Sequence, residues 1–170
     1  MTAERLSAND SMTRALRPSL WLLALTSVHH AYGALAFDTP WRWHVVPVAV
    51  VAAVALMLAA SLARRTEGRA ARTAMAAFAL LDLLLPGVGI GLFEGLYNHV
   101  LKNVLFFGGA TTRTMNMLFP PPTYEWPHDV VFEATGIAQG ALGLLVLWRW
   151  YTLVRNGKRG DRPATALQEH

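Results

Sequence analysis

Cysteine is absent from this chain. Its absence excludes disulfide bonds, metal sites with thiolate ligands and Cys-x-x-Cys redox chemistry. Charged residues are also scarce, at 15% of the 170 residues, whereas soluble domains carry about 25%. Hydrophobic residues make up 54% of the chain. This composition favours a membrane protein.

The apolar residues form four blocks, each of about the length that crosses a bilayer as a helix. The blocks are residues 18–37, 44–63, 73–93 and 130–152. We therefore predict an all-α integral membrane protein with a bundle of four transmembrane helices, for which the lipid bilayer is the first partner. A single domain is predicted for residues 1–155, followed by a disordered cytoplasmic tail at 156–170. No small-residue cleavage site follows the first block, so we expect no cleavable signal peptide.

The basic residues predict the orientation of the bundle. They precede the first helix, fill the segment 64–72 and follow the fourth helix, whereas only Arg42, Lys102 and Arg113 lie on the opposite side. This bias predicts that both termini are cytoplasmic and that a long extracytoplasmic loop joins helices three and four. The same bias accounts for the basic pI near 10, so we expect no nucleic-acid partner. The expected location is the inner (plasma) membrane of a bacterium.

Polar side chains from distant segments converge on the predicted extracytoplasmic half of the bundle. Five of the six histidines fall there, together with several acids. The set comprises His29, His30, His44, Glu94, His99, Glu125, His128, Asp129 and Glu133. This shared layer is the strongest functional signal in the sequence.

Histidine and carboxylate are the usual protein ligands of iron, copper or zinc when thiolate is absent. We predict a metal site whose ligands come from His29, His30, His99 and His128, with Glu94 or Glu133. Haem b held between His30 and His99 is a variant of this hypothesis. The favoured interpretation is accordingly a metal- or haem-binding membrane oxidoreductase.

Two other interpretations remain open at this point. A metal-free membrane enzyme could isomerise or cyclise a lipid or terpenoid by general acid–base catalysis, with Glu94, Glu133 and Asp82 as catalytic groups. Its small apolar substrate would be contacted by polar side chains near the site, namely Tyr97, Asn98, Tyr124, Glu125 and Gln139. Alternatively, the protein could be a small-solute or proton transporter, or a structural membrane protein, because an acid near the midplane such as Asp82 is rare without a function.

The helical phase of the third predicted helix makes a sharper prediction. On a straight α-helix Glu94 and His99 are about 140° apart, so they would not face one ion. We expect His99 to point inward, near a histidine of helix one and near His128 or Glu133. The glycines that follow Pro86 should loosen this helix, and Gly91 and Gly95 should let a neighbouring helix approach closely.

Overall fold

The structure, a computed structural model, describes residues 3–160 and the side chains of residues 10–156. All regular structure in these residues is helical, which confirms the predicted all-α class. The elements are α1 (Ala3–Ala36), the 3₁₀ helix η1 (Pro40–His44), α2 (Val45–Arg65), α3 (Gly68–Asp82), the π-helix η2 (Leu83–Leu101), α4 (Lys102–Phe107), α5 (Thr112–Leu118) and α6 (Val130–Gly160).

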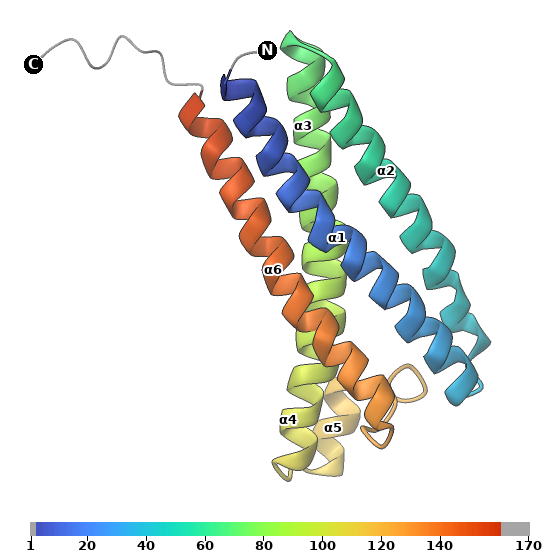
Figure 1. The fold of residues 1–170 in the computed structure, drawn as a ribbon. Coiled ribbons are helices and arrows are strands. Elements are labelled where there is room, and N and C mark those ends of the chain that lie inside the picture. The colour runs from blue at the N-terminus through green and yellow to red at the C-terminus, as the bar shows by residue number, and fades with distance from the viewer. Residues whose placement is uncertain (1–2, 161–170) are drawn as a thin grey trace, which may run out of the picture.

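Four rods run alongside one another: α1, α2, the continuous rod α3–η2–α4, and α6 (Figure 1). The turn between α2 and α3 lies at the same end as the start of α1 and the end of α6 (Figure 1). The opposite end carries η1, α4 and α5. Helix α1 contacts α2, α6 and η2, while α6 packs most extensively along η2. The loops therefore fall at the ends that the basic residues predicted, and the orientation in a membrane stays a prediction.

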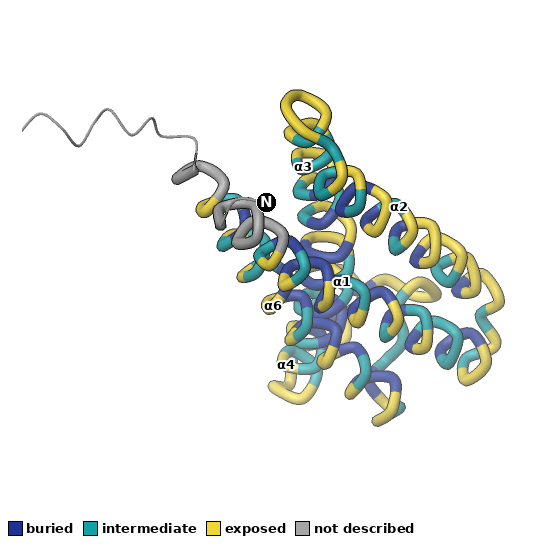
Figure 2. Tube along the Cα trace, turned by 45° about the horizontal axis from the view of Figure 1, so that its top comes forward, coloured by how far each residue is buried: buried dark blue, intermediate teal, exposed yellow. Residues whose placement is uncertain are grey.

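Three segments of the described chain are long and apolar enough to cross a membrane: Pro40–Arg65, Gly68–Phe107 and Val130–Asn156. Exposed residues recur along the outward side of α2 and α3 (Figure 2). The exposed apolar side chains of the three segments include Val51 and Trp148, as expected for contact with lipid. Membrane association is therefore indicated. Helix α1 runs beside these segments but is more polar, because Ser19, Thr26 and two histidines interrupt it. The count of four spans stays a prediction.

The segment Leu83–Leu101 is wound as a π-helix, with hydrogen bonds between residues five apart. Pro86 lies inside it and has no N–H to donate, so the tighter α-helical ladder is interrupted there. Gly87, Gly89 and Gly91 follow directly. The loosening predicted for this stretch is therefore present, and the π-helix continues past His99 to Leu101.

Glycines let η2 and α6 approach until their backbones touch. A Cβ on Gly91 would lie 2.6 Å from the Cα of Gly143, and a Cβ on Gly95 would overlap the backbone of Gly140. On α6, a Cβ on Gly136 would overlap the imidazole ring of His99. The close approach predicted from Gly91 and Gly95 is confirmed, and it presses His99 against α6.

An apolar core lies mainly in the half of the bundle nearest the α2–α3 turn and continues along α2 as far as Ala49. It is formed by α1, α2, α3 and α6, and its members include Met12, Leu16, Leu23, Ala52, Leu56, Phe78 and Leu153. The polar layer occupies the other half. The core thus holds the helices together while leaving the outer half for the polar side chains.

Candidate functional site

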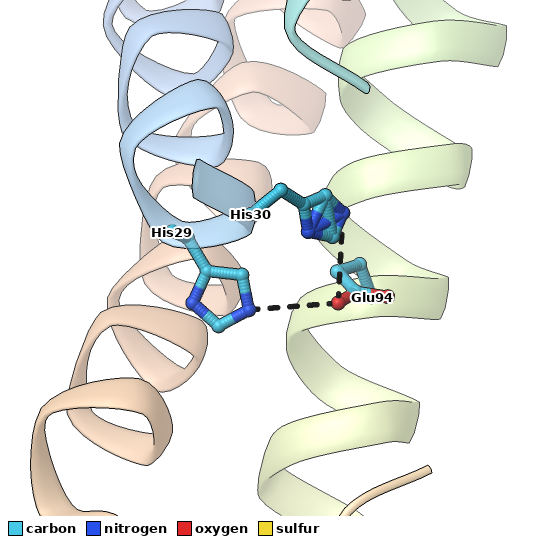
Figure 3. A group of neighbouring side chains, drawn as sticks. All are labelled: His29, His30 and Glu94. Carbon is cyan, nitrogen blue, oxygen red and sulfur yellow. Dashed lines mark ion pairs between the residues drawn. The ribbon is translucent and has the colours of Figure 1, made fainter. Parts of the chain in front are cut away.

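The centre of the polar layer is the carboxylate of Glu94 on η2. Its Oε1 lies 3.7 Å from His29 Nε2, 4.0 Å from His30 Nε2 and 3.6 Å from His99 Nε2. Figure 3 shows the two histidines of α1 pointing toward Glu94. These distances exceed those of N–H···O hydrogen bonds. They are close to the separation of about 3.4 Å between two ligands of one tetrahedral ion with bonds of ~2.1 Å.

The convergence of Glu94 and His99 overturns the expectation drawn from a straight α-helix. In the π-helical segment the hydrogen bonds join residues five apart, so residues i and i+5 approach one face. Glu94 and His99 have this spacing. Both side chains therefore reach the same point, where an α-helix would have separated them.

Hydrogen bonds assign the tautomer of His99. Its Nδ1 lies 2.8 Å from Glu133 Oε2 on α6. Glu133 also accepts hydrogen bonds from Lys102 Nζ, at 2.9 Å, and from Asn103 Nδ2, so it is a charged acceptor. The Nδ1 of His99 therefore carries a hydrogen, and in the neutral ring the lone pair of Nε2 points to Glu94. This carboxylate–histidine pair is the arrangement that orients histidine ligands of metals.

The tautomer of His29 is assigned in the same way. Its Nδ1 lies 2.8 Å from Thr135 Oγ1, whose hydroxyl donates within α6 to the carbonyls of Val131 and Phe132 at 2.8 and 3.0 Å. When the single hydroxyl hydrogen of Thr135 goes to one of these carbonyls, Oγ1 accepts the hydrogen of His29 Nδ1. The Nε2 of His29 is left with its lone pair toward Glu94, and this buried atom has no hydrogen-bond partner.

His30 and Asn98 complete the surroundings of Glu94. Asn98 Nδ2 donates to Glu94 Oε2 at 3.1 Å, which leaves Oε1 to the histidines. One ligand atom from each of His29, His30 and Glu94 lies within 4.8 Å of the others, and such a group could hold a metal ion. His99 Nε2, also buried and without a hydrogen bond, borders the group through Glu94.

A roof of two buried side chains covers the outer side of the cluster. Phe132 stacks on His29 with ring centroids 4.1 Å apart and lies edge-on to His99 at 5.1 Å. The guanidinium of Arg42 lies 5.1 Å from the centre of the Phe132 ring. Only 1% of Phe132 and 3% of Arg42 is exposed. The roof therefore separates the cluster from the end of the bundle that carries η1, α4 and α5.

Hydrogen bonds and ion pairs hold this roof in place. Arg42 Nε donates to Thr39 Oγ1 at 2.8 Å, and an Arg42 guanidinium nitrogen lies 3.5 Å from Glu125 Oε1. The backbone carbonyl of Glu125 accepts from Lys102 Nζ at 2.9 Å. Glu125 thus ties the loop before α6 to both η1 and α4.

The inward position predicted for His99 is confirmed, since its ring lies 4.8 Å from that of His29 and hydrogen-bonds Glu133. The structure does not bring His128 into the cluster. Its side chain is exposed, and its ring lies 5.6 Å from that of Phe106. The ligand roles themselves stay predictions.

The other predicted site residues lie around the cluster or apart from it. Tyr97 donates its hydroxyl to the carbonyl of Leu118 at 2.7 Å, while Tyr124 and Glu125 line a small pocket with Lys102. Gln139 is buried, and neither polar atom of its side chain has a partner.

Asp82 lies apart from the cluster, buried in the inner half of the bundle, where it accepts a hydrogen bond from Ser19 Oγ. Its predicted inward orientation is confirmed. Asp82 contributes no ligand to the group around Glu94.

Sequence reasoning treated Arg42 only as a marker of topology and expected Glu94 to pair with Lys102 or Asn98. Both Arg42 and Lys102 are buried beside the site, where Asn98 bonds Glu94 and Lys102 pairs with Glu133. Their positions held a signal, since Arg42 is flanked by two tryptophans and Lys102 lies in the polar stretch that contains Glu94 and His99. The contacts of Thr135 and Phe132 with His29 had no such signal in the sequence. They form only because α6 packs against α1.

Asp129 joins the start of α6 to α1, outside the membrane-spanning segments. The backbone N–H of Phe132 donates to its Oδ1 and the hydroxyl of Tyr32 to its Oδ2, each at 2.8 Å. These donors favour the charged form and lower the pKa of the Asp129 carboxyl, with the Phe132 N–H as the main cause. The carboxylate acts as the N-cap of α6.

Comparisons with known proteins provide no relative from which the role of this site could be inferred. No family model, no curated protein and no solved structure matches the chain. What the structure supports directly is a helical chain, with segments suited to a membrane, that holds a cluster of histidine and glutamate.

Proposed function

We propose that this protein is a membrane oxidoreductase in which His29, His30, His99 and Glu94 bind one redox-active metal ion. The observation that carries the proposal is the approach of three imidazole Nε2 atoms to one carboxylate oxygen, at 3.6 to 4.0 Å, without a hydrogen bond among them. The ligands come from α1 and η2.

The energetics of burial favour a cation at this point. In their neutral forms His29 and His99 direct lone pairs at a carboxylate, so like partial charges then face one another in a region removed from water. Buried charges and polar atoms without partners are costly. An ion placed among the four side chains would satisfy Glu94 Oε1 and the unpartnered nitrogens together.

The donor set favours iron or copper as the ion. His29, His30 and Glu94 form the set of two histidines and one carboxylate that binds iron in many non-haem Fe(II) centres, and His99 adds a third imidazole. Imidazole also suits copper. When bound, such an ion supplies one-electron chemistry. Haem b is less favoured, because Glu94 Oε1 approaches both His30 and His99 where the porphyrin would have to lie.

The protein's own groups would orient the ligands and exclude water. Glu133 and Thr135 fix the ring orientations of His99 and His29, and Asn98 holds the second oxygen of Glu94. Phe132 and Arg42 close the outer side. A centre of this kind would be rigid toward α6 and shielded from the extracytoplasmic solvent.

The test is the metal content of protein purified in detergent with an affinity tag free of histidine. Elemental analysis is expected to find about one iron or copper ion per chain, with a matching absorption or electron paramagnetic resonance signal. Glu94→Gln should lower metal affinity by roughly tenfold or more. Glu125→Gln is the matched control and should retain the ion.

Other outcomes of this experiment identify the alternatives. Stoichiometric zinc would keep the site and remove the redox role. Protein without metal, even after incubation with Fe(II), Cu(II) and Zn(II), would contradict the proposal. Catalysis by such metal-free protein would favour the acid–base isomerase or cyclase.

A further inference from the structure

The four proposed ligands differ in how far they are covered. The side chains of His29 and His99 are 0% exposed, whereas those of His30 and Glu94 are 13% and 15% exposed. The cluster therefore has a closed side at His29 and His99 and an open side at His30 and Glu94.

Two boundaries of the cluster are sealed. Toward α6, Thr135 contacts His29 and the backbone of Gly136 lies directly against the ring of His99. Toward the extracytoplasmic end, Phe132 and Arg42 form the roof described above. A molecule dissolved in water outside the membrane would have to displace this roof to reach Glu94.

The open side faces the apolar surroundings of the bundle. His30 lies seven residues from Leu23, on the face of α1 that packs into the core shared with α2. In this half α2 and η2 spread apart (Figure 1). The segment of α2 from Val45 to Ala60 contains no polar side chain, and Phe93 next to Glu94 is 51% exposed.

We infer that the substrate reaches the ion sideways from the membrane, as a small uncharged lipid-soluble molecule with an oxygen donor, of the phenol or quinol type. This inference rests on the proposed function. A charged molecule would lose its hydration on the apolar path beside α2, whereas a phenol keeps a hydroxyl that can bind an ion. His30 and Glu94 are the ligands such a molecule would meet first.

Accessibility of the open side is measured first, without any metal. Because the chain has no cysteine, Glu94→Cys offers one site for a nitroxide label in lipid nanodiscs. The experiment measures how often the label collides with oxygen, which is lipid-soluble, and with a water-soluble nickel chelate. The same label is placed for reference at Leu84→Cys, which faces outward within a span, and at Thr112→Cys, in the outer loop. We expect the label at Glu94→Cys to collide mainly with oxygen, as at Leu84→Cys. Frequent collisions with the nickel chelate, as at Thr112→Cys, would overturn the inference.

The second measurement uses the wild-type chain loaded with Co(II) in nanodiscs and follows the ligand-field absorption. The probes share a phenol group: 4-hexylphenol partitions into lipid and 4-hydroxybenzenesulfonate does not. Only 4-hexylphenol should change the wild-type spectrum, and Phe132→Ala, which opens the roof, should admit the sulfonate as well. A sulfonate response in the wild type would contradict lateral access. Failure to bind Co(II) would count against the metal site, and the nitroxide result would still decide the direction of access.

Discussion

Glu94 Oε1 and His99 Nε2 lie 3.6 Å apart although the two residues are five positions apart on one helix. The π-helical winding of Leu83–Leu101 produces this proximity, since it brings residues i and i+5 to one face. Pro86 and the glycines after it make that winding accessible to this segment. Local backbone geometry thus creates a pair of ligands that an α-helix would keep apart.

Glu133→Gln tests the carboxylate that orients His99. Glutamine keeps the shape but removes the charge, so His99 loses its charged acceptor and Lys102 loses its ion-pair partner. We expect metal affinity to fall by about 10- to 100-fold. Titration against a competing chelator measures this. Because the buried Lys102 could also destabilise the variant, Glu133→Gln with Lys102→Met should recover thermal stability but not affinity. Full recovery of affinity would contradict an orienting role.

Gly136→Ala tests the contact between α6 and His99. The added Cβ would overlap the imidazole, so either His99 or α6 must move. Overpacking of this kind costs about 1–3 kcal/mol, and we expect a lower melting temperature together with weaker metal binding. Gly89→Ala is the control, since a Cβ there meets only the Leu84 carbonyl at 3.2 Å. Equal metal binding by the two variants would show that His99 is not a ligand.

Asp82→Asn and Asp82→Leu test whether the second buried acid belongs to the site. Asp82 is bonded to Ser19 and contributes nothing to the group around Glu94, so both variants should insert in the membrane and keep their metal content. Asparagine preserves an acceptor for Ser19, and its effect on stability should stay near 1 kcal/mol. Elemental analysis and thermal unfolding check this. Loss of the ion in Asp82→Asn would place Asp82 in the metal centre.

Asp129 predicts a dependence of stability on acid pH. Its carboxyl pKa is lowered in the folded chain, so its contribution is fully present above the ordinary carboxyl pKa of about 4 and is lost as pH falls through the lowered value. The melting temperature should therefore drop below about pH 4. Asp129→Asn retains a capping side chain but does not titrate, and its profile should be flatter there. Identical profiles for the two proteins would refute the assignment.

The predicted orientation is tested by labelling single cysteines in intact and permeabilised membranes. Arg65→Cys, in the turn between α2 and α3, should react only with cytoplasmic reagent. Thr112→Cys, at the opposite end of the bundle, should react only from outside. Reaction of both positions from one side would contradict the topology and the shared outer layer.

The helical class and the gathering of His29, His30, Glu94, His99 and Glu133 in one half of the bundle could be predicted from the sequence. Both depend on properties that run along the chain: the length of apolar blocks and the distribution of basic residues. The direction of each helix then gives the depth of each polar residue along the bundle axis. This assignment requires no knowledge of how the helices pack.

Only the tertiary structure decided which of these residues meet. His128 has the same predicted depth along the bundle axis but is exposed. Glu94, which was predicted to lie on a different helix face from His99, lies beside His99. Lys102, a predicted partner of Glu94, pairs with Glu133 instead, and Arg42, which marks topology in the sequence, is a buried partner of Glu125. The meeting of Glu94 and His99 depends on the π-helical winding of one segment, which an α-helical reading of the sequence misses. The other meetings depend on the glycine contact between η2 and α6 and on the packing of separate helices, which no local pattern encodes.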